Sequence, residues 1–207
     1  MSNMYTETAF TIDTSSIKFG PGITKEAGYE LSRLGATRVL VVTDPQLANS
    51  PAVQTAIDSL KQANIDYAVF DQVSVEPTDS SLKRAIKFAV EGNFDGFLPV
   101  GGGSSIDTAK AVNLYSTYPA EFLEYVNAPI GKGTPVPGDL KPLVAVPTTA
   151  GTGSETTGVA IFDYEELGAK TGIAHRSLRP DVGLVDPENT RSLPKMVAAC
   201  SGFDVLS

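Results

Sequence analysis

A glycine-rich turn is the first stretch of this sequence whose residues could do chemistry. The letters GGGSS at residues 101–105 follow the apolar run 95–100 and precede a helical pattern. Glycine lets the backbone come close to a ligand, and a helix start offers free N–H groups and the positive end of its dipole. Gly102, Gly103 and Ser104 are therefore candidates to bind a phosphate group. The alternative is a tight strand-to-helix turn with Ser104 as its N-cap.

A second polar loop, PTTAGTGSETT at 147–157, also follows an apolar run, at 143–147. It places six hydroxyl side chains and one acid among two glycines, so it could donate many hydrogen bonds to an anionic, hydroxylated ligand. In open α/β sheets ligands bind at the carboxyl ends of the strands, where both loops would lie. We expect a shared crevice; a flexible polar loop is the alternative.

No G-x-G-x-x-G fingerprint follows the first apolar run, where the sequence reads TDPQLANS. The pyrophosphate of a dinucleotide would therefore belong at 101–105. Asp44 would then accept a hydrogen bond from a ribose hydroxyl and repel a 2′-phosphate, which favours NAD over NADP; a turn-capping aspartate is the alternative. His175 is predicted to be a loop histidine, and Lys170 a surface lysine unless the fold brings it to the crevice.

Apolar runs alternate with helical patterns along most of the chain. This alternation predicts an α/β fold with a parallel sheet that is covered on both faces. We expect strands at 37–44, 66–70, 95–100 and 143–147, helices at 50–64, 78–93 and within 101–115, two short strands beside the sheet at 10–22, a hairpin of 159–163 and 182–185, a surface loop at 127–142, and a helix from Pro194 onward.

Composition excludes several classes of protein. The net charge of −8, from 16 basic and 24 acidic residues, argues against sequence-independent nucleic-acid binding, and no apolar run has the length of a membrane span. One cysteine excludes a disulfide framework and suits a reducing cytosol. The first ten residues resemble neither a secretory signal nor a transit peptide. We expect a cytoplasmic protein without a nucleic-acid or membrane partner.

Three motifs in this order, GGGSSIDTAK, PTTAGTGSE and GFD, resemble those of the iron-containing (group III) alcohol dehydrogenase family. The stretches at 75–81, 126–133, 153–163 and 201–207 are similar to its hydroxyacid–oxoacid transhydrogenase branch. The resemblance implies a fold like that of dehydroquinate synthase. Residues 1–193 would form the NAD-binding α/β domain, and 194–207 would begin an all-helical, metal-binding domain.

The resemblance also implies roles for individual residues. Asp44 would bind the adenosine ribose, and Lys170 the nicotinamide ribose. The pyrophosphate and the rest of the cofactor would be held by Gly102, Gly103, Ser104, Asp107, Lys110, Thr148, Thr149 and Thr152. Asp204 would be the first ligand of Fe²⁺ or Zn²⁺; the next ligand of the family, a histidine one helical turn later, would fall one residue past Ser207.

The function implied for the intact protein is a metal-dependent, NAD-linked oxidoreductase. Its substrate would be a primary alcohol or a hydroxyacid, including hydride transfer from 4-hydroxybutyrate to 2-oxoglutarate, and the full-length protein would be a homo-oligomer. One alternative is a nucleotide-binding chain that catalyses nothing, because it carries one metal ligand. Another is a dehydroquinate-synthase-like lyase or a phospho-polyol dehydrogenase, which fold alone does not exclude.

Overall fold

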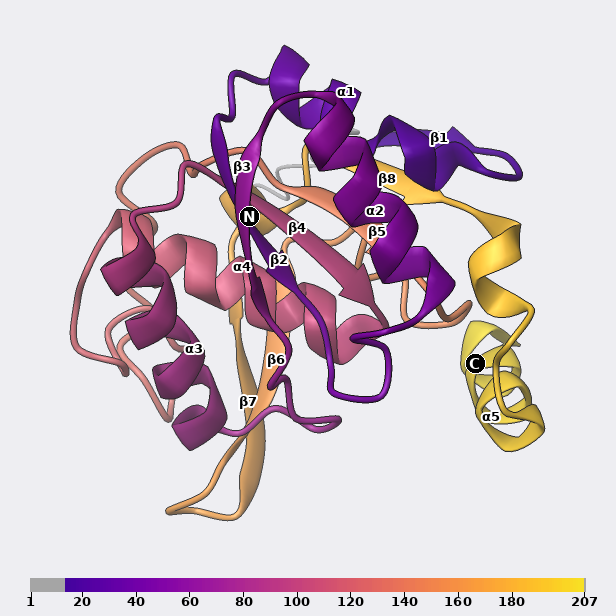
Figure 1. Cartoon of the computed structure of the whole chain (residues 1–207). Helices are drawn as coiled ribbons and strands as arrows, with labels where there is room; N and C mark the ends of the chain where they lie inside the picture. Colours follow the sequence, from indigo (N-terminus) through magenta and orange to yellow (C-terminus); the bar gives the residue numbers. More distant parts are fainter. Residues whose placement is uncertain (1–13, 207) are drawn as a thin grey trace, which may run out of the picture.

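The computed structural model describes residues 14–206 and shows a parallel sheet with helices on both faces (Figure 1). The sheet has six strands in the order β1-β8-β5-β4-β2-β3, and all of its pairings are parallel. Its strands are β1 (Ser16–Phe19), β2 (Arg38–Val42), β3 (Asp66–Phe70), β4 (Gly96–Gly101), β5 (Val144–Pro147) and β8 (Val182–Val185). The predicted α/β class is confirmed.

The helices divide between the two faces of the sheet. Their bounds are α1 (Ala27–Arg33), α2 (Pro51–Gln62), α3 (Asp79–Gly92), α4 (Gly103–Thr117) and α5 (Lys195–Leu206), with short 3₁₀ turns η1 (Ile23–Glu26), η2 (Arg176–Leu178) and η3 (Pro187–Thr190). On β2, Val39 and Val41 pack against α1 and α2, while Leu40 and Val42 pack against α3 and α4. This is the alternation that a strand buried on both faces requires.

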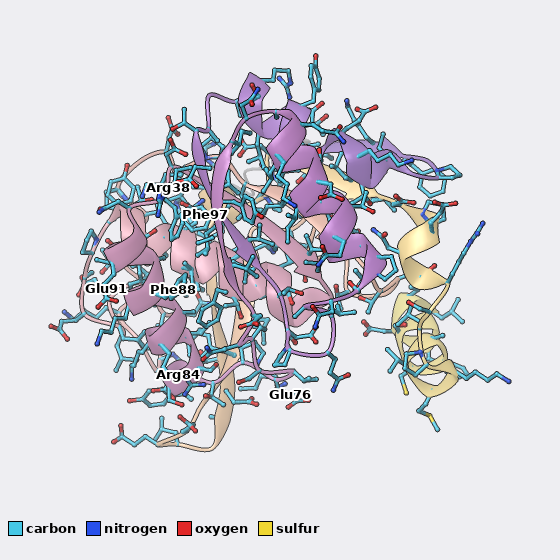
Figure 2. The ribbon with its side chains drawn as sticks, in the orientation of Figure 1. Arg38, Glu76, Arg84, Phe88, Glu91 and Phe97 are labelled. Carbon is cyan, nitrogen blue, oxygen red and sulfur yellow. The ribbon has the colours of Figure 1, made fainter. Side chains whose placement is uncertain are left out.

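Helices α2 and α3 begin as their sequences predict. The Ser50 hydroxyl accepts a hydrogen bond from the N–H of Val53, and Pro51 occupies the first helical position. Thr78 and Ser81 form a reciprocal capping box at the start of α3. Figure 2 shows Arg84 and Glu91 on the outer side of α3, and both are exposed. Side-chain caps therefore satisfy the starts of α2 and α3.

One expectation about strands was wrong, namely that 159–163 and 182–185 form a hairpin. Strand β6 (Val159–Tyr164) pairs in antiparallel fashion with β7 (Ala169–Ala174), which the sequence analysis missed, while 182–185 joins the main sheet. The sequence of β7, AKTGIA, contains Gly172, and a Cβ at this position would lie 2.5 Å from the carbonyl oxygen of Ala160. The close pairing of the two strands therefore requires glycine, although glycine has a low strand propensity. The segment 10–22 contributes one edge strand, β1, and residues 10–13 lie outside the described part.

The β6–β7 hairpin forms a third layer, on the outer side of α4. Phe162 and Ile173 of the hairpin pack with Leu114 and Tyr115 of α4, with Val126 just before the predicted 127–142 loop, and with Val136 inside that loop. That loop has no helix or strand, as expected. Ten of the fifteen residues of α4 are buried, because the sheet covers one of its sides and the hairpin the other. The glycine-rich turn thus begins the most enclosed helix.

The last helix, α5, lies beside the sheet rather than on a face of it (Figure 1). It begins directly after Pro194, as predicted, and none of its described side chains is buried. Met196, Phe203 and Leu206 are 74%, 74% and 82% exposed. No helix within residues 14–206 is both long and apolar enough to cross a membrane.

Candidate nucleotide-binding crevice

The start of α4 differs from the starts of α2 and α3. Gly102 is its N-cap in an extended conformation, and no side chain of the described residues caps the helix. The first backbone N–H groups of a helix have no partner within it, and here they open onto the end of β4. An uncapped helix start at the carboxyl end of a parallel strand is a ready site for an anion.

The two polar loops lie against each other. The N–H of Thr148 donates to the carbonyl oxygen of Gly101 at 3.0 Å. A Cβ on Gly102 would lie 3.3 Å from Cγ2 of Thr149, and a Cβ on Gly103 would lie 3.0 Å from Cγ2 of Thr152. These contacts explain why glycine is needed at both positions, and they form the crevice that the sequence predicts.

A cavity of about 570 Å³ opens beside this contact. Six of the predicted site residues line it: Gly103, Ser104, Asp107, Thr152, Lys170 and Asp204. Val75, Glu76 and Pro77, from the loop between β3 and α3, form a further wall that the sequence analysis did not assign. This loop lies within the stretch 75–81 (VEPTDSS) that resembles the transhydrogenase branch, but none of its residue types indicates a role.

Ser104 is neither the N-cap nor an unengaged donor. It lies in the first turn of α4, and its hydroxyl donates to the carbonyl oxygen of Val75. This bond attaches the 73–77 loop to the helix start. The backbone of Gly102 and Gly103, rather than the Ser104 hydroxyl, is therefore the part of the turn that is open to a phosphate.

Asp107 and Lys110 form a buried pair beneath the cavity. The Lys110 ammonium donates to Oδ1 of Asp107 at 3.3 Å, to the Thr157 hydroxyl at 3.2 Å and to the carbonyl oxygen of Val159 at 2.7 Å. Oδ2 of Asp107 accepts from the N–H of Ile161 at 3.1 Å. Burial raises the pKa of Asp107 and lowers the pKa of Lys110. The pair fixes the start of β6 to α4, and Lys110 does not reach the cavity surface.

Lys170 is the cation among the described residues that line this cavity. It projects from β7, and its Nζ lies 3.8 Å from carboxylate oxygens of both Glu76 and Asp163. Its side chain is 60% exposed, so these ion pairs are weak and the ammonium is free to meet a ligand. The fold has therefore brought this lysine to the crevice.

A smaller cavity, of about 230 Å³, lies on the other side of the same contact. Thr148, Leu47 and Ser50 line it together with Asp186. Asp44 lies next to it: its Oδ1 accepts from the N–H groups of Gln46 and Leu47, at 2.9 and 3.1 Å, as in a capped turn. Thr148 faces this cavity and Thr152 the larger one, so the hydroxyl-rich loop contributes to both.

Asp186 is a structural residue that the sequence analysis missed. Its oxygens accept from the N–H groups of Gly22 and Thr24, from the Thr24 hydroxyl at 2.8 Å, and from the N–H of Glu188. Burial acts to raise its pKa, but these donors outweigh burial and hold the pKa below its ordinary value of 3.8. The only signal in the sequence is an aspartate followed by proline at the end of a strand.

Asp204 reaches the larger cavity from α5. A Cβ on Gly151 would lie 2.6 Å from the carbonyl oxygen of Ser201, so the hydroxyl-rich loop lies close to this helix. Within residues 14–206 no three Asp, Glu, His or Cys side chains gather closely enough to bind a metal ion. His175 lies elsewhere and accepts from the N–H of Ser177, which confirms it as a loop histidine. The described residues do not by themselves provide a metal site.

Comparison with known proteins settles the family. The family model described as iron-containing alcohol dehydrogenase matches residues 14–187. The chain belongs to the iron-containing alcohol dehydrogenase family. It is 58% identical over 206 residues to the mitochondrial hydroxyacid-oxoacid transhydrogenase of Bos taurus and 54% identical to that of Homo sapiens. Each match covers 99% of this chain and 44% of the relative, so the chain spans less than half of those proteins.

Solved structures of other oxidoreductases show the same fold. A 1,3-propanediol oxidoreductase superposes with a TM-score of 0.87 at 29% identity, over 95% of this chain and 50% of its own. The sulfoacetaldehyde reductase of Bifidobacterium kashiwanohense, solved in complex with NAD⁺, gives 0.86 at 29% identity, over 97% and 52%. The dehydroquinate-synthase-like α/β fold predicted for this part of the chain is confirmed.

The expected cytoplasmic location was wrong. The similar transhydrogenases of Bos taurus, Rattus norvegicus and Homo sapiens are all named mitochondrial. A single unpaired cysteine excludes a disulfide framework, but it does not distinguish one reducing compartment from another. The single cysteine therefore could not support the expected cytoplasmic location.

Proposed function

We propose that this chain is the nucleotide-binding half of an NAD-linked oxidoreductase that acts on a primary alcohol or a hydroxyacid. The observation that carries the proposal is the uncapped start of α4, where Gly103 lines the larger cavity at the carboxyl edge of the sheet. The names of the similar relatives, hydroxyacid-oxoacid transhydrogenases, favour a hydroxyacid. The specific reaction that we propose, on the resemblance of the motifs, is hydride transfer from 4-hydroxybutyrate to 2-oxoglutarate.

The two cavities suit the two ends of NAD. The backbone of Gly102 and Gly103 would hold the pyrophosphate, because it combines free N–H groups with the positive end of a helix dipole. Asp44 and Thr148 would meet the adenosine end, while Thr152 and Lys170 would meet the nicotinamide end. When bound, the nicotinamide ring supplies the site that accepts or returns a hydride.

In this proposal, four of the predicted cofactor residues hold the crevice in shape instead of binding NAD directly. Thr149 packs against Gly102, and the Ser104 hydroxyl holds the 73–77 loop. Asp107 and Lys110 fix β6 to α4. The alternative of a lyase or phospho-polyol dehydrogenase on the same fold gains no support from these contacts.

The metal site would be completed by residues outside this chain. Asp204, at the rim of the larger cavity, would be the first ligand of Fe²⁺ or Zn²⁺, and such sites take three or four protein ligands. In the proposed division, residues 1–193 form the NAD-binding domain and 194–207 begin a helical domain, within a homo-oligomer. This chain alone would then bind NAD without catalysing hydride transfer.

Calorimetric titration of the 207-residue chain with NAD and with NADP tests the nucleotide site. We expect saturable binding of NAD and weaker binding of NADP. Asp44→Asn should reduce the difference between the affinities for NAD and NADP, because it removes the charge that repels a 2′-phosphate. Absence of NAD binding would refute the proposal.

A second assay tests the reaction. The chain is given NAD, Fe²⁺ or Zn²⁺, and 4-hydroxybutyrate, a simple alcohol or glycerol phosphate, and NADH formation is followed by absorbance. We expect no turnover with any substrate. Metal-dependent turnover by this chain would show that it carries a complete active site.

A further inference from the structure

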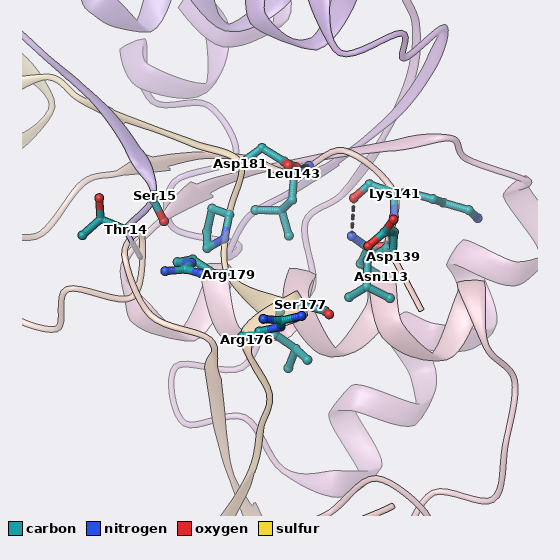
Figure 3. Close-up of a pocket in the computed structure, with 13 residues that line it drawn as sticks. Thr14, Ser15, Asn113, Asp139, Lys141, Leu143, Arg176, Ser177, Arg179 and Asp181 are labelled. Carbon is teal, nitrogen blue, oxygen red and sulfur yellow. Dashed lines mark hydrogen bonds between the residues drawn. The ribbon is translucent and has the colours of Figure 1, made fainter. Parts of the chain in front are cut away.

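A polar cavity of about 340 Å³ lies at the edge of the sheet opposite the crevice (Figure 3). It is lined by residues that immediately precede three strands: Ser15 before β1, Leu143 before β5 and Asp181 before β8. The nucleotide crevice lies at the carboxyl ends of the strands, so the length of the sheet separates the two. No residue assigned to the cofactor or to the metal lines this cavity.

Ser15 gives the first indication of a ligand. Its side chain is 7% exposed, and its hydroxyl is the one buried side-chain polar atom of the described residues without a hydrogen-bond partner. Native proteins satisfy nearly all such groups, so an orphan on a cavity wall indicates a partner that binds there. Because a hydroxyl can both donate and accept a hydrogen bond, Ser15 alone does not show whether the ligand is an anion or a cation. The charges of the neighbouring side chains decide this.

Two arginines line the same cavity as Ser15. They are Arg176 of η2 and Arg179, which follows η2; Figure 3 shows Arg179 beside Ser15 and Arg176 beside Ser177. Arg176 forms no ion pair with any acid in the described part of the chain. A guanidinium presents parallel N–H donors that match a carboxylate or a phosphate. Because the chain as a whole carries a charge of −8, this pairing is not part of a generally basic surface.

The remaining wall limits the size and charge of the ligand. Asn113 is fully engaged: its Nδ2 donates to the carbonyl oxygen of Lys141 at 2.7 Å, and its Oδ1 accepts from the N–H of the same residue at 3.2 Å. Asp139 and Asp181 also line the cavity, and Asp181 accepts from the N–H of Leu143 at 2.9 Å. Two carboxylates would repel a polyanion, so the cavity fits a compact molecule with one anionic group.

We propose that this cavity binds a small oxyanion, a carboxylate or a phosphate, between Arg176 and the Ser15 hydroxyl, at a site separate from the nucleotide crevice. Its volume lies at the lower end of the range for small-molecule sites, about 300–1,000 Å³. The inference does not depend on the proposed oxidoreductase function.

Thermal unfolding of the 207-residue chain at constant ionic strength tests the site. Inorganic phosphate and acetate are titrated in separate arms, with sodium chloride as the reference salt. We expect at least one anion to raise Tm saturably. Arg176→Gln should raise the half-saturating concentration about tenfold, which is the loss of one charge-assisted hydrogen bond, and Ser15→Ala about threefold.

The matched control is Arg84→Gln. Arg84 is an exposed arginine of α3, far from the cavity, and its replacement removes the same charge without touching the site (Figure 2). It should leave the titration unchanged. An equal weakening by Arg84→Gln and Arg176→Gln would overturn the proposal, as would the failure of both anions to act more than chloride does.

Amide chemical shifts locate the anion independently. The anion should move the backbone ¹⁵N–¹H signals of 139–143 and 176–181. Shifts confined to 101–105 would overturn the proposal and assign the anion to the phosphate turn of the crevice. A response to phosphate alone or to acetate alone would support the site and identify its chemistry.

Discussion

Two helices of this protein touch the same cavity and are built in opposite ways. Helix α4 has ten buried residues, whereas α5 has none among its described side chains. Both sequences are rich in apolar residues, so composition does not cause the difference. The sheet and the β6–β7 hairpin enclose α4, while α5 extends past the sheet with Phe203 exposed. The comparison teaches that the elements packed around a helix, rather than its own composition, decide whether its side chains are buried.

The largest expected effect is the loss of the buried pair of α4. Lys110→Met leaves the Asp107 carboxylate and the Val159 carbonyl without their partner in a region of little water. We expect the free energy of unfolding in urea to fall by about 3–5 kcal/mol. The control is Lys87→Met on α3, where the lysine is 77% exposed and pairs across one turn with Glu91, which is 67% exposed. It should cost less than about 1 kcal/mol, and equal losses would contradict the structure.

The next effect concerns the connection between the sheet and α5. Asp186→Asn replaces a carboxylate that accepts four hydrogen bonds by an amide that matches them poorly, and we expect a loss of about 2 kcal/mol at pH 7. The donors around Asp186 hold its folded-state pKa below 3.8. Its contribution is therefore complete above about pH 4 and is lost as the pH falls through the folded pKa.

Urea unfolding at several pH values measures this dependence. The difference between wild type and Asp186→Asn should be constant from pH 7 to 5 and should shrink toward pH 3. A difference that grows on acidification would show that the carboxylate is not preferentially stabilised in the folded state.

Two helical glycines compare α4 and α5 directly. Gly103→Ala places a methyl group 3.0 Å from Thr152, where the second loop meets the helix start. We expect NAD affinity, measured by calorimetry, to fall about tenfold, which corresponds to about 1.4 kcal/mol. Gly202→Ala on α5 meets no heavy atom within 4 Å, and it should leave NAD affinity unchanged. If both variants bind NAD like wild type, the turn at 101–105 does not hold the pyrophosphate.

The smallest effect on stability is expected on α5. Phe203 is 74% exposed, so Phe203→Ser should change the free energy of unfolding by less than about 0.5 kcal/mol. It should nevertheless weaken self-association, since exposed apolar side chains drive contacts between copies. Sedimentation velocity measures this. A wild-type chain that is already a clean monomer would count against self-association through α5.

What the sequence could predict followed from local patterns. Buried parallel strands read as unbroken apolar runs, and the caps Ser50 and Thr78 marked two helix starts. The two polar loops could be assigned to one edge of the sheet because parallel strands share a direction. The burial of individual side chains could not be predicted from such patterns. Lys110 has the spacing of a ligand-binding lysine, but the fold buries it beneath the hairpin.

The features that the sequence analysis missed depend on partners far along the chain. Strand β7 is held by its pairing with β6 rather than by its own propensity, and the Ser104 hydroxyl is directed by the carbonyl of Val75. Asp186 has its role only because Gly22 and Thr24 return to it from the other end of the described chain. No short pattern contains that information.

The order of strands in the sheet constrains how the chain can fold during synthesis. Strand β1 comes first in the described sequence, but its one partner is β8, and Ser16 pairs with Val182. The central strands β2, β3 and β4 can pair as soon as each is made, whereas β1 must wait for almost the whole chain. Closing so long a loop is slow. Until then the N–H and C=O groups of β1 have no strand partner, so this edge of the sheet should be the last to form.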